Sequence, residues 1–133
     1  MLREDLVYKD EYYKIVGILI KVFKDLGGEL LEKHYQKAVA IALKLAGIDF
    51  VEQHPIKLYY EGKFIGIYYA DFLIKIGEAK IILEIKKHEN FGIKNIKQLS
   101  DYIKLEHVKL GILANFTKTG VVCKRIVNIV SQV

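Results

Sequence analysis

The sequence predicts an α/β fold in which a central mixed β-sheet is flanked by α-helices. Segments with helical apolar spacing and β-rich runs follow one another in the order helix, helix, three strands, helix, two strands. Hydrophobic residues make up 52% of the 133 residues, which is enough for a core that needs no disulfides. We expect residues 1–133 to form one domain.

The helices are predicted from apolar spacing and from glycines that end them. Residues 11–25 carry apolar side chains at helical spacing, and Gly27 and Gly28 stop that helix. A second helix is expected from about residue 29 to 46, ended by Gly47. A third helix is expected over residues 93–106, after a break in the chain at residues 90–92.

The strands are predicted where β-branched and aromatic residues gather between turn signals, over residues 50–60, 64–76, 79–86, 109–115 and 121–130. Residues 61–63 and 77–78 are expected to form hairpin turns. Pro55 indicates that the first strand lies at a sheet edge or begins irregularly, because proline cannot donate a ladder hydrogen bond.

Basic side chains are concentrated in the C-terminal part of the chain. Residues 1–85 hold 12 basic and 13 acidic side chains, whereas residues 86–133 hold 9 and 3. This asymmetry favours an anionic partner such as nucleic acid, although a solvated Lys-rich surface gives the same count. No apolar run approaches the roughly 18 residues of a membrane span, and no signal peptide is evident, so we expect a cytoplasmic protein.

Two polar features lie on neighbouring predicted strands. Glu84 and Lys86 are two residues apart and therefore share one face of their strand. Asp71 interrupts an apolar strand, where an unpaired carboxylate is costly. Antiparallel pairing could bring Asp71 and Glu84 together, which would favour a hard divalent cation between them. The alternatives are a solvated Glu-x-Lys face and an Asp that pairs with a lysine or caps a bulge.

The predicted helices contribute three further candidates. Glu32 lies on the same helical face as the apolar Val39 and Leu43, so its carboxylate should point inward. It could equally interact with the positive N-terminus of its helix. Gln98 and Tyr102 are four residues apart at the border between an apolar and a lysine-rich helix face, where they could contact a phosphate backbone and a base or simply surround the core.

Together these residues resemble the signature of the PD-(D/E)XK nuclease superfamily. Asp71 followed by Glu84-Ile85-Lys86 is similar to its D…(D/E)xK motif, and Gln98-x-x-x-Tyr102 resembles the QxxxY motif of its RecB-like branch. The glycine turn followed by Glu32 and Tyr35 resembles the GxxExxY proteins of that superfamily. The resemblance extends from Leu26 nearly to the C-terminus.

Two positions depart from the GxxExxY pattern. The glycine expected three residues before Glu32 is Glu29, although Gly27 and Gly28 keep a glycine turn. The proline often found before the aspartate is Ala70. Neither position would supply a ligand. The single cysteine, Cys123, is too few for the iron–sulfur cluster of some RecB-like relatives.

The resemblance implies a restriction-endonuclease-like core and a metal-dependent nuclease acting on nucleic acid, with DNA as the expected substrate. Asp71, Glu84 and the carbonyl of Ile85 would hold Mg²⁺ or Mn²⁺, and Glu32 would help to hold a second ion or its water. Lys86 would orient the attacking water and offset phosphate charge. Gln98 and Tyr102 would position the strand. A homodimer is also considered, since small structure-specific nucleases often pair to reach two strands.

The lysines of the third predicted helix are the candidates for phosphate contacts, namely Lys94, Lys97 and Lys104. Two other functional classes stay open. The same fold could serve as a non-catalytic module that binds nucleic acid or a partner. Alternatively, the Glu-x-Lys pattern could be coincidental in a structural protein. Metal binding distinguishes a nuclease from these two classes, and salt-dependent DNA binding distinguishes the two classes from each other.

Overall fold

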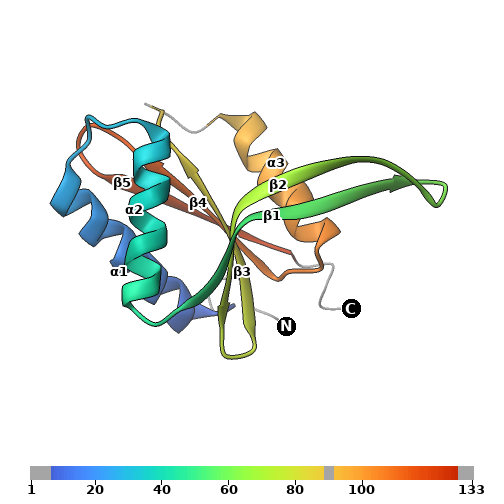
Figure 1. Ribbon diagram of the computed structural model, residues 1–133, viewed down its shortest axis with the longest axis horizontal. Coiled ribbons are helices and arrows are strands. Elements are labelled where there is room, and N and C mark those ends of the chain that lie inside the picture. The colour runs from blue at the N-terminus through green and yellow to red at the C-terminus, as the bar shows by residue number, and fades with distance from the viewer. Residues whose placement is uncertain (1–6, 89–91, 129–133) are drawn as a thin grey trace.

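The computed structural model describes residues 7–88 and 92–128, and within them the elements follow the expected order (Figure 1). The helices are α1 (Lys9–Leu26), α2 (Glu32–Leu45) and α3 (Ile93–Leu105), and the strands are β1 (Asp49–Tyr60), β2 (Lys63–Ile76), β3 (Ala79–Lys86), β4 (Leu110–Phe116) and β5 (Val121–Val127). Residues 90–91 of the predicted chain break and residues 129–130 of the predicted last strand lie outside the described residues.

The five strands form one mixed sheet in the order β1-β2-β3-β4-β5. The pair β3–β4 is parallel and the other three pairs are antiparallel, so α3 is the crossover between the two parallel strands. Pro55 lies in β1 at the sheet edge, as expected. The predicted α/β class with a mixed sheet is confirmed.

Helices cover both faces of the sheet (Figure 1). On one face α1 and α2 bury Ile15, Tyr35 and Leu83 in a shared core, and on the other face α3 packs through Leu99 onto Ile82. Leu83 and Ile82 are adjacent in β3, so the strand alternation divides its side chains between the two layers. Among the described residues, no helix is long and apolar enough to cross a membrane.

Strands β1 and β2 continue beyond the sheet as a two-stranded hairpin. The pairing of β2 with β3 ends at Phe72 and Leu83, whereas the pairing of β1 with β2 continues to Tyr60 and Lys63. The turn at its end is made by Glu61 and Gly62, which have φ angles of 49° and 77°. We call residues 54–70 the arm; Figure 1 shows it projecting away from the body of the protein.

Helix α2 begins at Glu32, three residues later than predicted. The preceding residues form a loop because the Tyr35 hydroxyl donates a hydrogen bond to the Gly27 carbonyl (2.5 Å) and accepts one from the Leu30 amide (3.2 Å). The ring of Tyr35 is fully buried and stacks on Phe116 of β4, with ring centroids 4.3 Å apart. Tyr35 therefore holds the glycine turn against the core.

Candidate active site

Asp71 and Glu84 occupy the position where β2 and β3 separate. They lie next to Phe72 and Leu83, which are the last paired residues of β2 and β3, and they would be the next pair in the antiparallel register. Their side chains replace the ladder: the Asp71 carboxylate accepts a hydrogen bond from the Ile85 amide (2.8 Å), and the Glu84 carboxylate accepts one from the Asp71 amide (3.3 Å). The sheet thus brings the two acids together, as antiparallel pairing led us to expect.

Glu84 is a buried acid, with 4% of its surface exposed. Burial, the charge of Asp71 and a hydrogen bond between the two carboxyl groups together raise the pKa of Glu84 to about 9, against the opposing effect of Lys86. Two neighbouring carboxylates in a low-dielectric site cannot both ionise easily unless a cation offsets their charge. The pair therefore favours the binding of a positive ion.

Lys86 shares the face of Glu84 and is half-buried at the end of β3. Its ammonium is close enough to lower the pKa of Glu84. Ile85, between them, points the other way into the fully buried core beneath α1 and α2. A buried apolar residue thus lies between the two polar residues in the sequence, and β3 presents an acidic and a basic side chain next to each other.

A shallow groove lies between α3 and the base of the arm, beside the carboxylates. It has a volume of about 210 Å³ and is lined by Tyr68, Lys94, Lys97, Gln98, Asp101 and Tyr102. Burial and the negative charge of Glu84 and Asp71 together raise the pKa of Tyr102 to about 12. Gln98 hydrogen-bonds Tyr102, whose ring lies 5.6 Å from that of Tyr68 on the arm.

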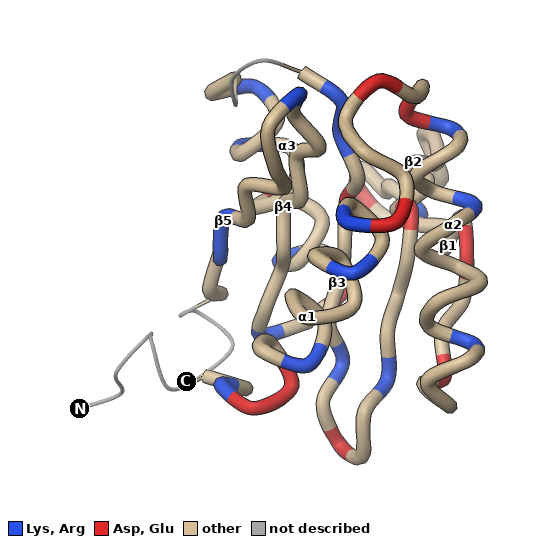
Figure 2. Tube along the Cα trace, turned by 90° about the vertical axis from the view of Figure 1, so that its left-hand side faces the viewer, with Lys and Arg blue, Asp and Glu red and all other residues tan. Residues whose placement is uncertain are grey.

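The predicted lysines do not all lie at this groove. Lys94 and Lys97 line it, and Lys97 is 3.6 Å from Asp101 in an exposed ion pair. Lys104 is exposed in the last turn of α3, outside the groove. Figure 2 shows basic positions on α2 as well as on α3, so basic residues are not confined to the C-terminal part of the fold.

Comparison with known proteins identifies the family. A model of the PD-(D/E)XK nuclease superfamily matches residues 9–126. This chain belongs to that superfamily. A search of curated proteins gives no match.

A solved structure described as "Crystal structure of SSO0001" has a similar fold, with a TM-score of 0.58 at 20% sequence identity. The alignment covers 91% of the present chain and 60% of the SSO0001 chain, so the present chain spans less than two thirds of that protein. At this identity the likeness concerns the fold alone.

Nucleases of the PD-(D/E)XK superfamily generally use divalent metal ions. The residues at the parting of β2 and β3 fit such an ion, because carboxylate oxygens are the ligands that Mg²⁺ prefers. A cation between Asp71 and Glu84 would also remove the repulsion that raises the pKa of Glu84.

Glu32 is not brought into the same group. It is the first residue of α2 and is half-exposed, and its helical face continues through the buried Val39 and Leu43 as expected. Within residues 7–88 and 92–128, no three His, Cys, Asp or Glu side chains come close enough to form a metal site. The structure therefore joins two of the three predicted acids.

Two residues at the site had no role assigned from the sequence. Tyr68 lines the groove opposite Tyr102, and its place three residues before Asp71 in an aromatic strand was the available signal. Asn115 is buried at the end of β4 beside Lys86, and its amide group both accepts from the His88 amide (2.8 Å) and donates to the His88 carbonyl (2.7 Å). Asn115 thereby fixes the chain just after Lys86.

The burial of Glu84 predicts how the stability of the metal-free protein depends on pH. In the folded chain the pKa of Glu84 is about 9, against an ordinary value of 4.5. The folded state therefore binds more protons than the unfolded state. The contribution of Glu84 to the free energy of unfolding is fully present below about pH 4.5 and is lost as the pH rises toward about 9. In EDTA, Glu84→Gln should match wild type near pH 5.

At about pH 8 the variant should be more stable than wild type by about 1–2 kcal/mol, a few degrees in Tm. Thermal denaturation across this range measures the difference. Glu78→Gln, an exposed acid in the turn between β2 and β3, is the matched control and should track wild type at every pH. A difference that does not grow with pH would contradict the burial of an ionisable carboxyl at position 84.

Proposed function

We propose that this chain is a metal-dependent nuclease that hydrolyses phosphodiester bonds in nucleic acid, with DNA as the substrate and Mg²⁺ or Mn²⁺ as the ion. The observation that carries the proposal is the placement of Asp71 and Glu84 opposite each other where β2 and β3 separate, with Lys86 on the same face. Membership of the PD-(D/E)XK nuclease superfamily supports the reaction class.

The residues where β2 and β3 separate have different roles in this reaction. Asp71 and Glu84 hold the ion, and the carbonyl of Ile85 offers a third oxygen. When bound, the ion supplies positive charge and lowers the pKa of an attacking water. Lys86, whose ammonium already acts on Glu84, orients that water and offsets charge on the phosphate.

The groove positions the substrate strand. Gln98 and Tyr102 are held together by a hydrogen bond beside the carboxylates, and Lys94 and Lys97 supply phosphate contacts. Lys104 makes a more distant phosphate contact from the last turn of α3. Glu32 contributes to a second ion only if substrate binding brings it nearer to the pair.

Within the superfamily, we assign the chain to the GxxExxY proteins and the RecB-like branch. The order of their motifs supports this, and Tyr35 gives one motif a physical meaning, since its hydroxyl holds the Gly27 turn. A homodimer would give such a nuclease access to two strands.

The proposal is tested by cleavage of DNA with Mg²⁺ or Mn²⁺ and with EDTA. Wild type should cleave only with the metal. Lys86→Met keeps the length of the side chain and removes its charge, so its single-turnover rate should fall about a hundredfold. Lys80→Met, an exposed lysine on the same strand, is the matched control and should cleave at the wild-type rate. Metal-independent cleavage, or an unchanged rate for Lys86→Met, would contradict the proposed mechanism.

A non-catalytic nucleic-acid-binding module is the second candidate. The separation of Glu32 from Asp71 and Glu84 favours it, because the described residues then offer two carboxylates rather than three. In that case the protein would bind DNA through Lys94 and Lys97 in a salt-dependent way and would not cleave it with any divalent ion.

A further inference from the structure

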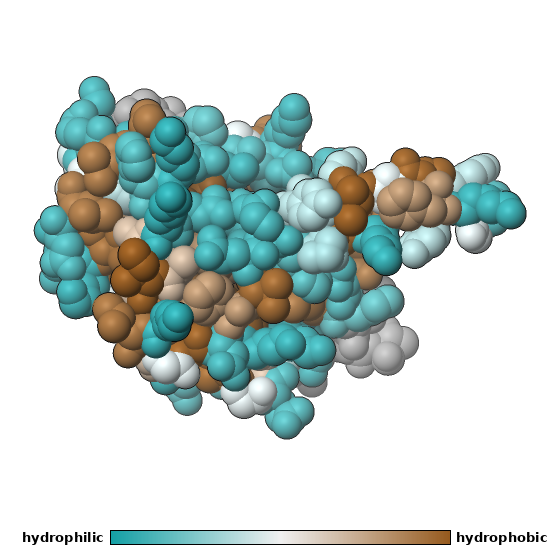
Figure 3. Space-filling model, viewed as in Figure 1, coloured by the Kyte–Doolittle hydropathy of each residue, from teal (hydrophilic) through white to brown (hydrophobic). Residues whose placement is uncertain are grey.

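The arm leaves many of its aromatic side chains exposed to solvent, which does not stabilise a hairpin. Its aromatic side chains are 46–68% exposed, namely Tyr59, Tyr60, Phe64, Tyr68 and Tyr69. Figure 3 shows hydrophobic residues along the arm where it stands clear of the body, with hydrophilic residues at its end. A lone two-stranded hairpin is only marginally stable in water, and an exposed aromatic surface of this kind marks a binding site.

The base of the arm is nevertheless anchored to α3. Ile56 is 1% exposed and belongs to the core beneath that helix. His54 lies 3.4 Å from Glu106 at the end of α3, and the ring of Tyr68 contacts that of Tyr102. The arm is therefore held in place at the active site, and its exposed part begins there.

One face of the arm continues the groove. Tyr68 pairs across the hairpin with Ile56, Gly66 with Leu58, and Lys63 with Tyr60. The register shifts between Leu58 and Tyr59, where Ile65 is an extra residue of β2, but β1 itself is continuous, so Ile56, Leu58 and Tyr60 alternate onto one face. Tyr68 lines the groove at one end of this face, and Tyr60 with Lys63 lies at the other, about 13 Å away. Gly66 leaves the space between them open, since a Cβ there would meet only Leu58, at 4.0 Å.

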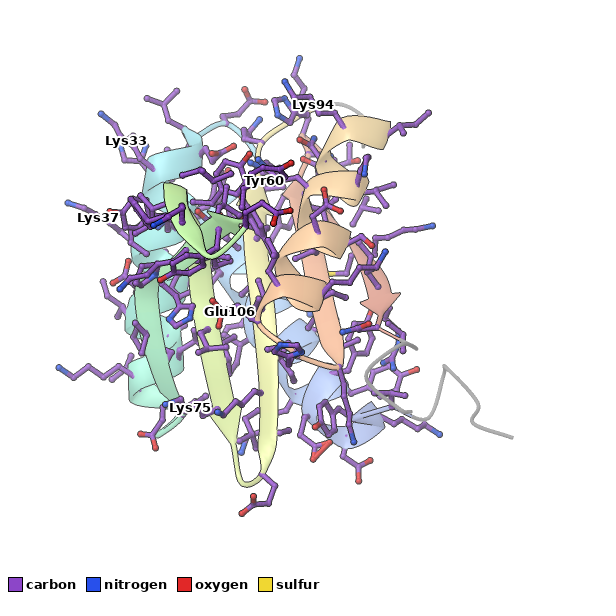
Figure 4. All side chains as sticks on the ribbon, turned by 90° about the vertical axis from the view of Figure 1, so that its right-hand side faces the viewer. Lys33, Lys37, Tyr60, Lys75, Lys94 and Glu106 are labelled. Carbon is purple, nitrogen blue, oxygen red and sulfur yellow. The ribbon has the colours of Figure 1, made fainter. Side chains whose placement is uncertain are left out.

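Lysines lie at both ends of this path. Lys94 and Lys97 of α3 line the groove beside Tyr68, and Lys63 pairs with Tyr60 near the end of the arm. All three lysines are exposed. Figure 4 looks along the arm, with Tyr60 near its end and Lys94 on α3. Positive charge at both ends of a row of spaced aromatic rings is complementary to a chain of phosphates that carries bases.

We propose that the arm binds single-stranded nucleic acid, with bases stacked on Tyr68 and Tyr60 as the strand leaves the carboxylate pair. The inference rests on the proposed nuclease function for the identity of the ligand. Bases in a duplex are already stacked on one another and cannot lie on separated side chains, whereas unpaired bases can. The substrate class is therefore single strands, or duplexes with single-stranded ends or flaps.

The test measures binding without cleavage. Fluorescence anisotropy in EDTA would use a labelled DNA of about 20 nucleotides as a single strand and as the matching duplex. Wild type should prefer the single strand. Tyr60→Ala should weaken that binding about tenfold, and Tyr60→Phe, which keeps the ring, should stay within about twofold of wild type. Tyr13→Ala, a 61% exposed tyrosine on α1 across the sheet, should bind as wild type.

Equal affinity for both DNAs, or unchanged single-strand binding by Tyr60→Ala, would overturn the inference. Light scattering adds a further outcome: if Tyr60→Ala converts a dimer into a monomer and leaves single-strand affinity unchanged, the arm is a subunit interface instead. The two proposals fail separately. If the protein cleaves DNA with a metal ion but Tyr60 contributes nothing to binding, the proposed nuclease function stands and the proposed role of the arm is wrong. If Tyr60 contributes to single-strand binding but the protein does not cleave DNA, the role of the arm stands and the nuclease function is wrong.

Discussion

Replacing Asp71 with asparagine is expected to lower metal-dependent cleavage by at least about a thousandfold, because half of the charge that holds the ion is removed. The substitution should leave the fold intact, since the amide oxygen can still accept the 2.8 Å hydrogen bond from the Ile85 amide. Single-turnover cleavage at saturating Mg²⁺ measures the catalytic effect, and thermal denaturation in EDTA measures the structural one.

Asp49→Asn is the matched control, since Asp49 is exposed at the start of β1. It pairs with Lys75, at the end of the β1–β2 pairing that is farthest from the arm. Asp49→Asn should cleave as fast as wild type. If Asp71→Asn stays within about tenfold of wild type while folding normally, Asp71 does not hold the ion. If Asp71→Asn unfolds, the loss of activity says nothing of metal binding, and calorimetry with Mg²⁺ on Glu84→Gln then decides the role of the pair.

Replacing Gly28 with valine is expected to destabilise the protein by about 3 kcal/mol or more, which corresponds to roughly 10 °C in Tm. A Cβ on Gly28 would lie 2.4 Å from the Thr117 carbonyl oxygen and 2.6 Å from that of Lys118. Both contacts are with backbone atoms, so no side chain can rotate away. The turn after α1 would have to separate from the turn between β4 and β5.

Gly17→Ala provides the opposite result in the same chain. Gly17 lies in α1, and a Cβ added there would meet no packed neighbour within 4 Å among the described residues, so alanine should stabilise the helix by about 1 kcal/mol. Thermal denaturation of both variants compares a glycine required by close packing with one that is not. A Tm for Gly28→Val within a few degrees of wild type would show that the two turns can separate at little cost.

Elements marked by local signals could be predicted from the sequence. Gly62 and Gly77 mark turns with positive φ, and Pro55 marks the edge strand. The alternation of Glu84 with Ile85 correctly divided β3 between a polar site and a buried core. These features depend on a few neighbouring residues, which is why a single sequence reveals them.

Features that depend on distant contacts were missed. The start of α2 moved to Glu32 because the Tyr35 hydroxyl binds the loop before the helix, a contact that helical periodicity cannot show. The arm was predicted only as a hairpin, since nothing local indicates that β3 stops pairing with β2 at Leu83. The distance from Glu32 to the carboxylate pair likewise depends on how α2 crosses the sheet.

The hydrogen bond between Ile85 and Asp71 has a consequence for hydrogen exchange. An amide inside a sheet is normally protected by the carbonyl of a neighbouring strand and exchanges only when the strands open. The Ile85 amide is protected by a side-chain carboxylate instead. Its exchange rate therefore reports the state of the Asp71 carboxylate and of whatever binds there, and it does so from within a strand whose other side is fully buried.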